Sequence, residues 1–126
     1  MAVSVSFEIE GLNKLLRALE KLDDEAKKEF KDIGKKVGDF VAERARQEAP
    51  VVTGRLRGSI RSAATGRGVK IRAGSKRVPY ASVIHFGWKK RNIQENRFLY
   101  RAVDKSVDEA VDMYLKEIYT IWNRNV

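Results

Sequence analysis

The sequence contains no cysteine, a single histidine and only two prolines in 126 residues. Without cysteine there are no disulfides, no thiolate chemistry and no zinc site built on sulfur ligands. No run of about 18 apolar residues is present, as a membrane-spanning helix requires. The N-terminal residues also lack the basic and then apolar pattern of a signal peptide. These absences predict a soluble protein that is made in the cytoplasm, holds no metal or other cofactor and does not enter a membrane.

Acidic residues are nearly absent from the middle of the chain. Residues 50–101 contain 13 lysines and arginines but one acid, Glu95, which gives this segment a net charge of +12. Residues 1–49 have a net charge of −1 and residues 102–126 one of −2, so the middle segment accounts for the whole excess of +9. Such an excess predicts an acidic partner, either nucleic acid or the acidic face of another protein.

Length and hydrophobic periodicity predict a single domain, residues 1–126, of the α+β class. Alternation of apolar and polar residues predicts a strand from Val3 to Glu10. Apolar residues at gaps of three or four predict helices over residues 12–49 and 98–122. The first of these segments is either one long helix or a short helix followed by a long one. We therefore expect an antiparallel sheet of about four strands, packed by a long N-terminal helix and a long C-terminal helix.

The first helical segment contains two glycines and ends before a proline. Gly34 and Gly38 predict a place where the helix approaches the sheet closely, and Pro50 ends the helix because the residue before a proline is disfavoured in helical conformation. The apolar stripe, which includes Phe30 and Phe40, either covers the sheet of the same subunit or forms a seam with another subunit. We favour the first interpretation.

A β-hairpin is predicted by two alternating segments, residues 55–64 and 69–73, around a turn at residues 65–68. In this register five cations share one face of the hairpin: Arg55, Arg57, Arg61, Lys70 and Arg72. Antiparallel sheets commonly leave one face in water, but a solvated face usually mixes both signs of charge. The hairpin face is therefore either merely solvated or the surface that meets a partner or the DNA in a channel.

Residues that could perform chemistry are isolated in this sequence, which predicts that the protein is not an enzyme. His85 has no accompanying nucleophile motif, and a lone histidine between apolar residues is usually a packed or surface residue. Basic residues are interleaved with Tyr80, Phe86 and Trp88 in this part of the chain, which favours contact with nucleic acid. No recognised helix–turn–helix or RNA-binding signature accompanies them, so only sequence-independent backbone contact is indicated.

Three short motifs in the basic middle resemble the signature of a family of tailed-phage proteins. They are Ala49-Pro50-x-x-Thr53-Gly54-x-Leu56-x-x-Ser59-Ile60, Tyr80-Ala81-x-x-Ile84-x-Phe86-Gly87 and Arg97-Phe98-Leu99-x-x-Ala102. The second motif lacks the acid that is usual in the family, and the third has Arg97 and Arg101 where the family has prolines. The family comprises head–tail joining, neck and tail-completion proteins of phages with long non-contractile tails, often called minor capsid or minor tail proteins.

The resemblance implies a structural virion protein at the head–tail junction, where it connects the portal side of the capsid to the tail. It implies a ring of six or twelve copies, neighbouring neck and tail proteins as partners, and non-specific contact with DNA in the channel. The motif residues of interest are Pro50, Thr53, Gly54, Leu56, Tyr80, Ala81, Gly87, Phe98 and Leu99. Two alternatives remain open: a tail terminator that caps the tail tube, and a free cytoplasmic protein that binds nucleic acid without sequence preference.

Overall fold

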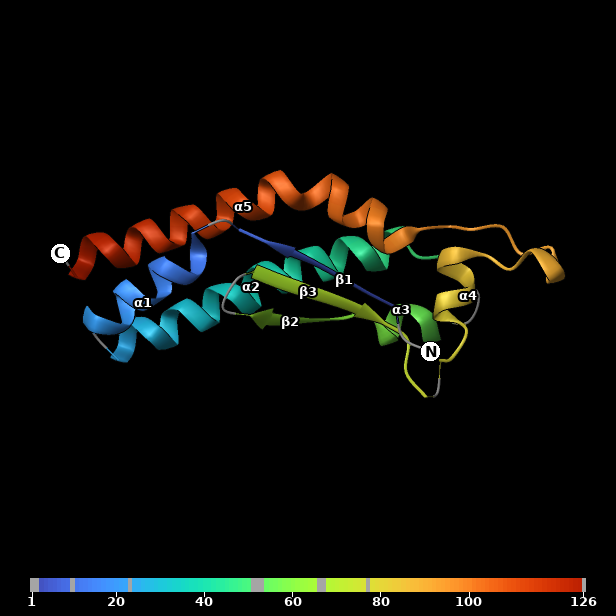
Figure 1. Cartoon of the computed structure of the whole chain (residues 1–126), viewed down its shortest axis with the longest axis horizontal. Coiled ribbons are helices and arrows are strands. Elements are labelled where there is room, and N and C mark those ends of the chain that lie inside the picture. Colours follow the sequence, from blue (N-terminus) through green and yellow to red (C-terminus); the bar gives the residue numbers. More distant parts are fainter. Residues whose placement is uncertain are drawn as a thin grey trace.

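The computed structural model describes residues 3–9, 11–22, 24–50, 54–65, 68–76 and 78–125. Within these residues, strands β1 (Val3–Glu8), β2 (Arg61–Thr65) and β3 (Gly68–Ala73) form one antiparallel sheet in the spatial order β1-β3-β2. The long helices α2 (Asp24–Glu48) and α5 (Phe98–Asn125) pack against each other and against the sheet (Figure 1). The α+β class and the long C-terminal helix are confirmed, but the described sheet has three strands instead of about four.

The remaining elements lie at the two ends of an elongated molecule (Figure 1). Helix α1 (Leu12–Leu22) lies at one end of the molecule and packs against α2. The short helices α3 (Arg55–Ser59) and α4 (Ala81–Phe86) and the 3-10 helix η1 (Lys89–Arg91) lie towards the other end. The N-terminal helical region is thus divided between α1 and α2, so the single long N-terminal helix is not formed.

Two glycines bring α2 close to the edge strand β2. A Cβ atom built on Gly34 would lie 2.8 Å from the Cβ of Ala64, and one built on Gly38 would lie 2.8 Å from the Oγ of Ser62. Only a residue without a side chain fits at these distances, so the predicted close approach of helix and sheet is confirmed. Helix α2 ends at Glu48, as Pro50 predicted.

The core lies between the sheet and the two long helices. On α2, Phe30, Ile33 and Val37 are buried, and the Phe30 ring lies 6.3 Å from that of the buried Tyr114 on α5. The apolar stripe therefore packs within its own subunit, as we favoured. Phe40 is an exception, because it is only half-buried and the guanidinium of Arg44 lies 5.8 Å from its ring centroid. The side chains of Leu15, Leu19, Leu22 and Ala26, also part of the predicted stripe, lie outside the described residues.

Ion pairs join α2 to α5 along their length. Glu48, near the end of α2, accepts hydrogen bonds from Arg101 Nε at 2.8 Å and from Lys105 Nζ at 2.6 Å. These two hydrogen bonds, from Arg101 first, hold the pKa of the Glu48 carboxyl below its usual range. Further pairs along the same contact are Lys36–Glu117, Arg44–Glu109 and Arg124–Glu29. The charges that face each other between these helices are therefore neutralised within the chain.

Residues 55–59 form helix α3, so the strand predicted from residue 55 is wrong over this part. The reason is that Leu56 and Ile60, both buried, are four residues apart, a spacing that fits one face of a strand and one face of a helix equally well. Gly54 precedes the helix with a φ of 81°, and the Oγ of Ser59 donates to the carbonyl of Leu56 at 2.6 Å. The true hairpin therefore begins only at Arg61.

Candidate interaction surfaces

The sheet has one face on the helices and one open face. Residues paired directly across antiparallel strands point to the same side of a sheet. Arg61 pairs with Arg72, and Lys70 pairs with Ala63 on one side and with Ser6 on the other. These three cations therefore share the open face. We call Arg61, Lys70 and Arg72 the cationic sheet face.

Two of the five predicted cations do not belong to the cationic sheet face. Arg55 and Arg57 lie on α3, at the end of the sheet, because residues 55–59 are helical. They are exposed, and Arg55 lines a shallow hollow with Gly58 and Ser59. An acid also joins the open face, since Glu8 lies beside Gly68 at its far end. The face is thus less uniform in sign than the sequence predicted.

The three cations of the open face differ in how they are held. Arg61 Nη1 donates to the carbonyl oxygens of Ser59 at 2.7 Å and Gly74 at 3.0 Å, so this guanidinium ties α3 and the end of β3 together. Lys70 and Arg72 form no ion pair within the described part of the chain. Like charges that face each other across strands are destabilising, so Arg72 beside Arg61 does not serve the fold.

An acidic stripe on α5 was not anticipated. Asp104, Asp108 and Asp112 are exposed and four residues apart, so they share one face of the helix. The buried positions Ala102, Ser106 and Ala110 repeat with the same spacing but lie two residues earlier, which is about half a helical turn. The face with the aspartates is therefore turned away from the core. No ion pair joins these three aspartates to another described residue. The four-residue spacing was visible in the sequence, but which acids of α5 are paired was not.

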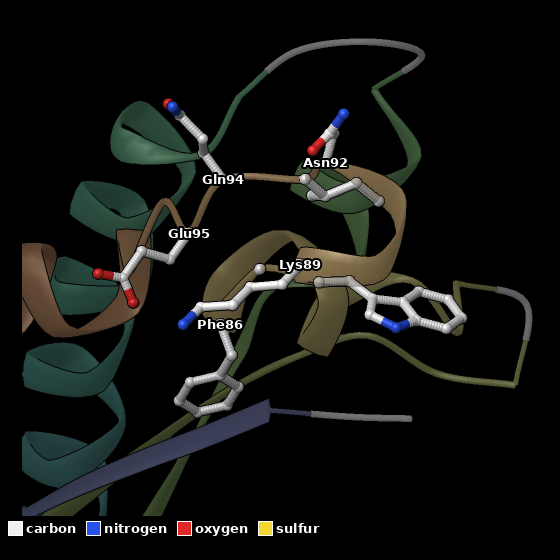
Figure 2. A pocket seen from close by; sticks show the side chains of 8 residues that line it. Phe86, Lys89, Asn92, Gln94 and Glu95 are labelled. Atoms are coloured by element: carbon white, nitrogen blue, oxygen red, sulfur yellow. The ribbon is translucent and has the colours of Figure 1, made fainter.

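A third surface lies at the end formed by α4, η1 and the start of α5. Phe86 and Trp88 are each 46% exposed, and Tyr80, Ile93 and Tyr100 are also exposed. Residues 86–89 and 92–95 line a hollow in which Phe86 points away from Asn92 and Gln94 (Figure 2). The guanidinium of Arg91 lies 5.6 Å from the Trp88 ring, and that of Arg97 lies 5.7 Å from the Tyr100 ring. We call this surface the aromatic end.

His85 is packed inside the aromatic end, which confirms the interpretation of a packed histidine. Its side chain is fully buried, with ring centroids 4.6 Å from Phe86, 5.3 Å from Phe98 and 4.5 Å from Tyr100. Neither ring nitrogen has a hydrogen-bond partner among the described residues. Burial lowers the pKa of His85, and the nearby cations Arg97 and Arg101 lower it further. The neutral imidazole therefore acts as an apolar ring here.

The residues of the family motifs serve the geometry of the fold more than its surface. Leu56, Ala81, Phe98 and Leu99 are buried in the core, and Pro50 is half-buried after α2.

Two motif glycines have backbone angles that other residues resist. Gly54 has a φ of 81° and Gly87 a φ of 79°. A Cβ on Gly87 would lie 2.8 Å from the nitrogen of Glu95 and 2.8 Å from the carbonyl oxygen of Ile93. Gly87 thus allows α4 to turn sharply into the loop of the aromatic end. Tyr80 is exposed, and Thr53 lies outside the described residues.

The described residues contain no cluster of three or more histidines, acids or cysteines that could hold a metal ion. Among the described helices, none combines the length and the apolar character needed to cross a membrane.

A two-layer α+β domain with three exposed surfaces of distinct chemistry is suited to contacts with other macromolecules. The comparison with protein families assigns the chain to the structural tail components of bacteriophages. The chain belongs to the family described as "Bacteriophage HK97-gp10, putative tail-component", whose model matches residues 13–87. This confirms the resemblance to a family of tailed-phage structural proteins that the motifs indicated. No curated protein and no solved structure matches the chain.

Proposed function

We propose that the protein is a subunit of a ring of six or twelve copies at the head–tail junction of a phage, where it connects the portal side of the capsid to the tail. Membership of a family of structural tail components supports this role. A joining protein needs a surface for neighbouring neck or tail proteins as well as contacts between its own copies. The function lies in these contacts and in no chemical step.

The aromatic end is the observation that carries this proposal. Trp, Tyr and Arg are the residue types enriched at the energetically dominant positions of protein interfaces. The aromatic end exposes Trp88 and Tyr100, and each ring has an arginine guanidinium within 6 Å of its centroid. Rings already stacked on guanidinium groups lose little conformational freedom when a partner covers them. This end of the molecule therefore contacts the adjoining neck or tail protein.

The experiment that tests this role is removal of the protein from an infection, followed by electron microscopy of the products. We expect DNA-filled heads and complete tails that remain separate. Tails of uncontrolled length would instead indicate the tail terminator, and normal joined particles would refute both structural roles.

A point variant assigns the contact to the aromatic end. Trp88→Ala should reduce the yield of joined particles by about 30-fold or more, the loss expected when a dominant interface residue worth about 2 kcal/mol is truncated. Tyr119→Ala is the matched control, because Tyr119 is 67% exposed on α5, outside this surface. Equal yields from the two variants would contradict the assignment.

A further inference from the structure

Unpaired charges of opposite sign are separated on this molecule. On the cationic sheet face, Lys70 and Arg72 have no acidic partner among the described residues, and on α5 the stripe of Asp104, Asp108 and Asp112 has no basic one. Other acids on these helices, such as Glu48 and Glu117, are used in ion pairs between α2 and α5. The two free sets lie on different elements that face different sides, so they cannot neutralise each other within one copy.

The spacing of the two sets allows one to lie along the other. Aspartates four residues apart repeat at about 6 Å along a helix axis. Lys70 and Arg72 are two residues apart on β3 and repeat at about 7 Å along the strand. A helix laid along β3 would therefore bring two successive acids opposite two successive cations.

The surroundings of the two cations leave room for such a helix. Their neighbours on the open face include Ser4 and Ser6 on β1 and Ala63 on β2, which are small and exposed. Small side chains let a helix approach a sheet closely while the longer cations extend to its flank. Helices α2 and α5 cover only the other face of the sheet, so no helix of the same copy occupies this one among the described residues.

We infer that the acidic stripe on α5 of one copy docks on the cationic sheet face of the next copy. The contact joins two different surfaces, so it is head-to-tail, and repetition of one such contact closes a ring when the rotation per subunit allows it. This inference rests on the proposed ring function and specifies which surfaces build the ring.

Double-stranded DNA is the competing occupant of the cationic sheet face, and the observations favour a protein. Non-specific DNA binding usually rests on several phosphate contacts per protein. Here Arg61 is already bound to two carbonyl oxygens, and Glu8 on the same face would repel phosphates. Two free cations among small side chains fit one acidic helix better than a phosphate backbone.

Cross-linking tests the contact directly, because the chain contains no cysteine of its own. The double variant Arg72→Cys, Asp108→Cys of the full chain is treated with a short bismaleimide. We expect a ladder of covalent oligomers, since each copy carries both halves of the contact. Either single variant places only one thiol in the contact, so it should give no ladder and at most chance dimers. The matched control is Arg72→Cys with Asp32→Cys, which places the second thiol at an exposed acid on α2. A ladder from the control and none from the test variant would overturn the inference.

Charge exchange tests whether attraction between these surfaces drives the contact. One variant carries Lys70→Glu and Arg72→Glu, and the other carries Asp108→Lys and Asp112→Lys. Each alone should associate with itself about tenfold or more weakly than the wild type, measured by sedimentation, because attraction becomes repulsion. An equimolar mixture should recover association, because each variant then meets the opposite charge on its neighbour. The control for the first variant is Lys31→Glu with Lys35→Glu, two exposed positions on α2. It changes the net charge by the same amount as Lys70→Glu with Arg72→Glu, but it should not weaken self-association.

The outcomes separate this inference from the proposed function. Failure of the mixture to recover association would overturn the contact. Loss of salt-sensitive binding to double-stranded DNA in the Lys70→Glu, Arg72→Glu variant, with wild-type self-association, would show a nucleic-acid surface and also overturn it. A protein that joins heads to tails but yields no ladder refutes the contact alone. A ladder from a protein that is dispensable for joining supports the contact and refutes the function.

Discussion

Charged residues of the helix layer and of the open sheet face differ in where their partners lie. Between α2 and α5, Arg101 and Lys105 meet Glu48 within the chain. On the sheet face, Lys70 and Arg72 meet no acid among the described residues, and Arg72 faces another arginine across the strands. Charge in the first region serves the fold, whereas charge in the second costs the fold a little and is available to another molecule.

The largest loss of stability is expected from truncation of the aromatic side chain that is buried between the two long helices. Tyr114 is fully buried between the two long helices, so Tyr114→Ala should lower the free energy of unfolding by about 3–5 kcal/mol. Denaturant unfolding followed by circular dichroism measures this loss. Tyr119→Ala, on the exposed side of the same helix, should stay within about 0.5 kcal/mol of the wild type. Comparable losses in both would mean that α5 does not pack as described.

Truncation of a paired and an unpaired cation compares the two regions directly. Arg101 binds Glu48 and Asn96 at once, and its side chain is 39% exposed, so we expect Arg101→Ala to cost about 1–2 kcal/mol of unfolding free energy. Lys70→Ala should change stability by less than about 0.5 kcal/mol. The same denaturant titration measures both variants. An equal loss of unfolding free energy would mean that the charges between the helices stabilise the fold no more than the charges on the open sheet face.

The buried histidine adds a dependence of stability on pH. The pKa of His85 in the folded protein is lower than its ordinary value of 6.5, since burial disfavours the charged ring. As the pH falls below 6.5, the unfolded chain binds the proton first, so stability decreases; above 6.5 the effect is absent. His85→Phe should remove this decrease, measured as unfolding midpoints between about pH 7.5 and 5.5. An unchanged slope in the variant would place the titrating group elsewhere.

The smallest expected effect is a gain in stability on removal of a like-charge pair. Arg61 and Arg72 face each other across β2 and β3, so Arg72→Thr should remove a like-charge pair and raise the free energy of unfolding by about 0.2–1 kcal/mol at low salt. The gain should shrink as salt is added, because exposed charges are screened. Thermal unfolding at two salt concentrations measures it. A loss of stability would show that Arg72 contributes to the fold after all.

Local patterns in the sequence were sufficient for several features of this fold. Alternation predicted β1, periodicity predicted the helical regions that contain α1, α2 and α5, and Pro50 predicted the end of α2. Gly34 and Gly38 predicted the close approach to β2. Each of these depends on residues within a few positions of one another, where backbone preferences and side-chain period act directly.

The features that sequence reasoning missed depend on contacts between distant residues. The segment around Leu56 and Ile60 satisfied both a strand and a helix, and packing at the end of the sheet selected the helix α3. Phe40 is only half-buried because of where α2 meets its neighbours, which its helical spacing alone did not reveal.

The candidate surfaces were predicted only in part for the same reason. The sequence by itself determined that the chain is basic in its middle and that Lys70 and Arg72 point to the same face of their strand. Only the tertiary structure decided which charges are paired: Glu48 and Arg101 are 53 residues apart, yet their side chains meet. Pairing across such separations depends on how α2 and α5 lie side by side. In that arrangement the aspartates of α5 have no ion-pair partner among the residues that the structure describes.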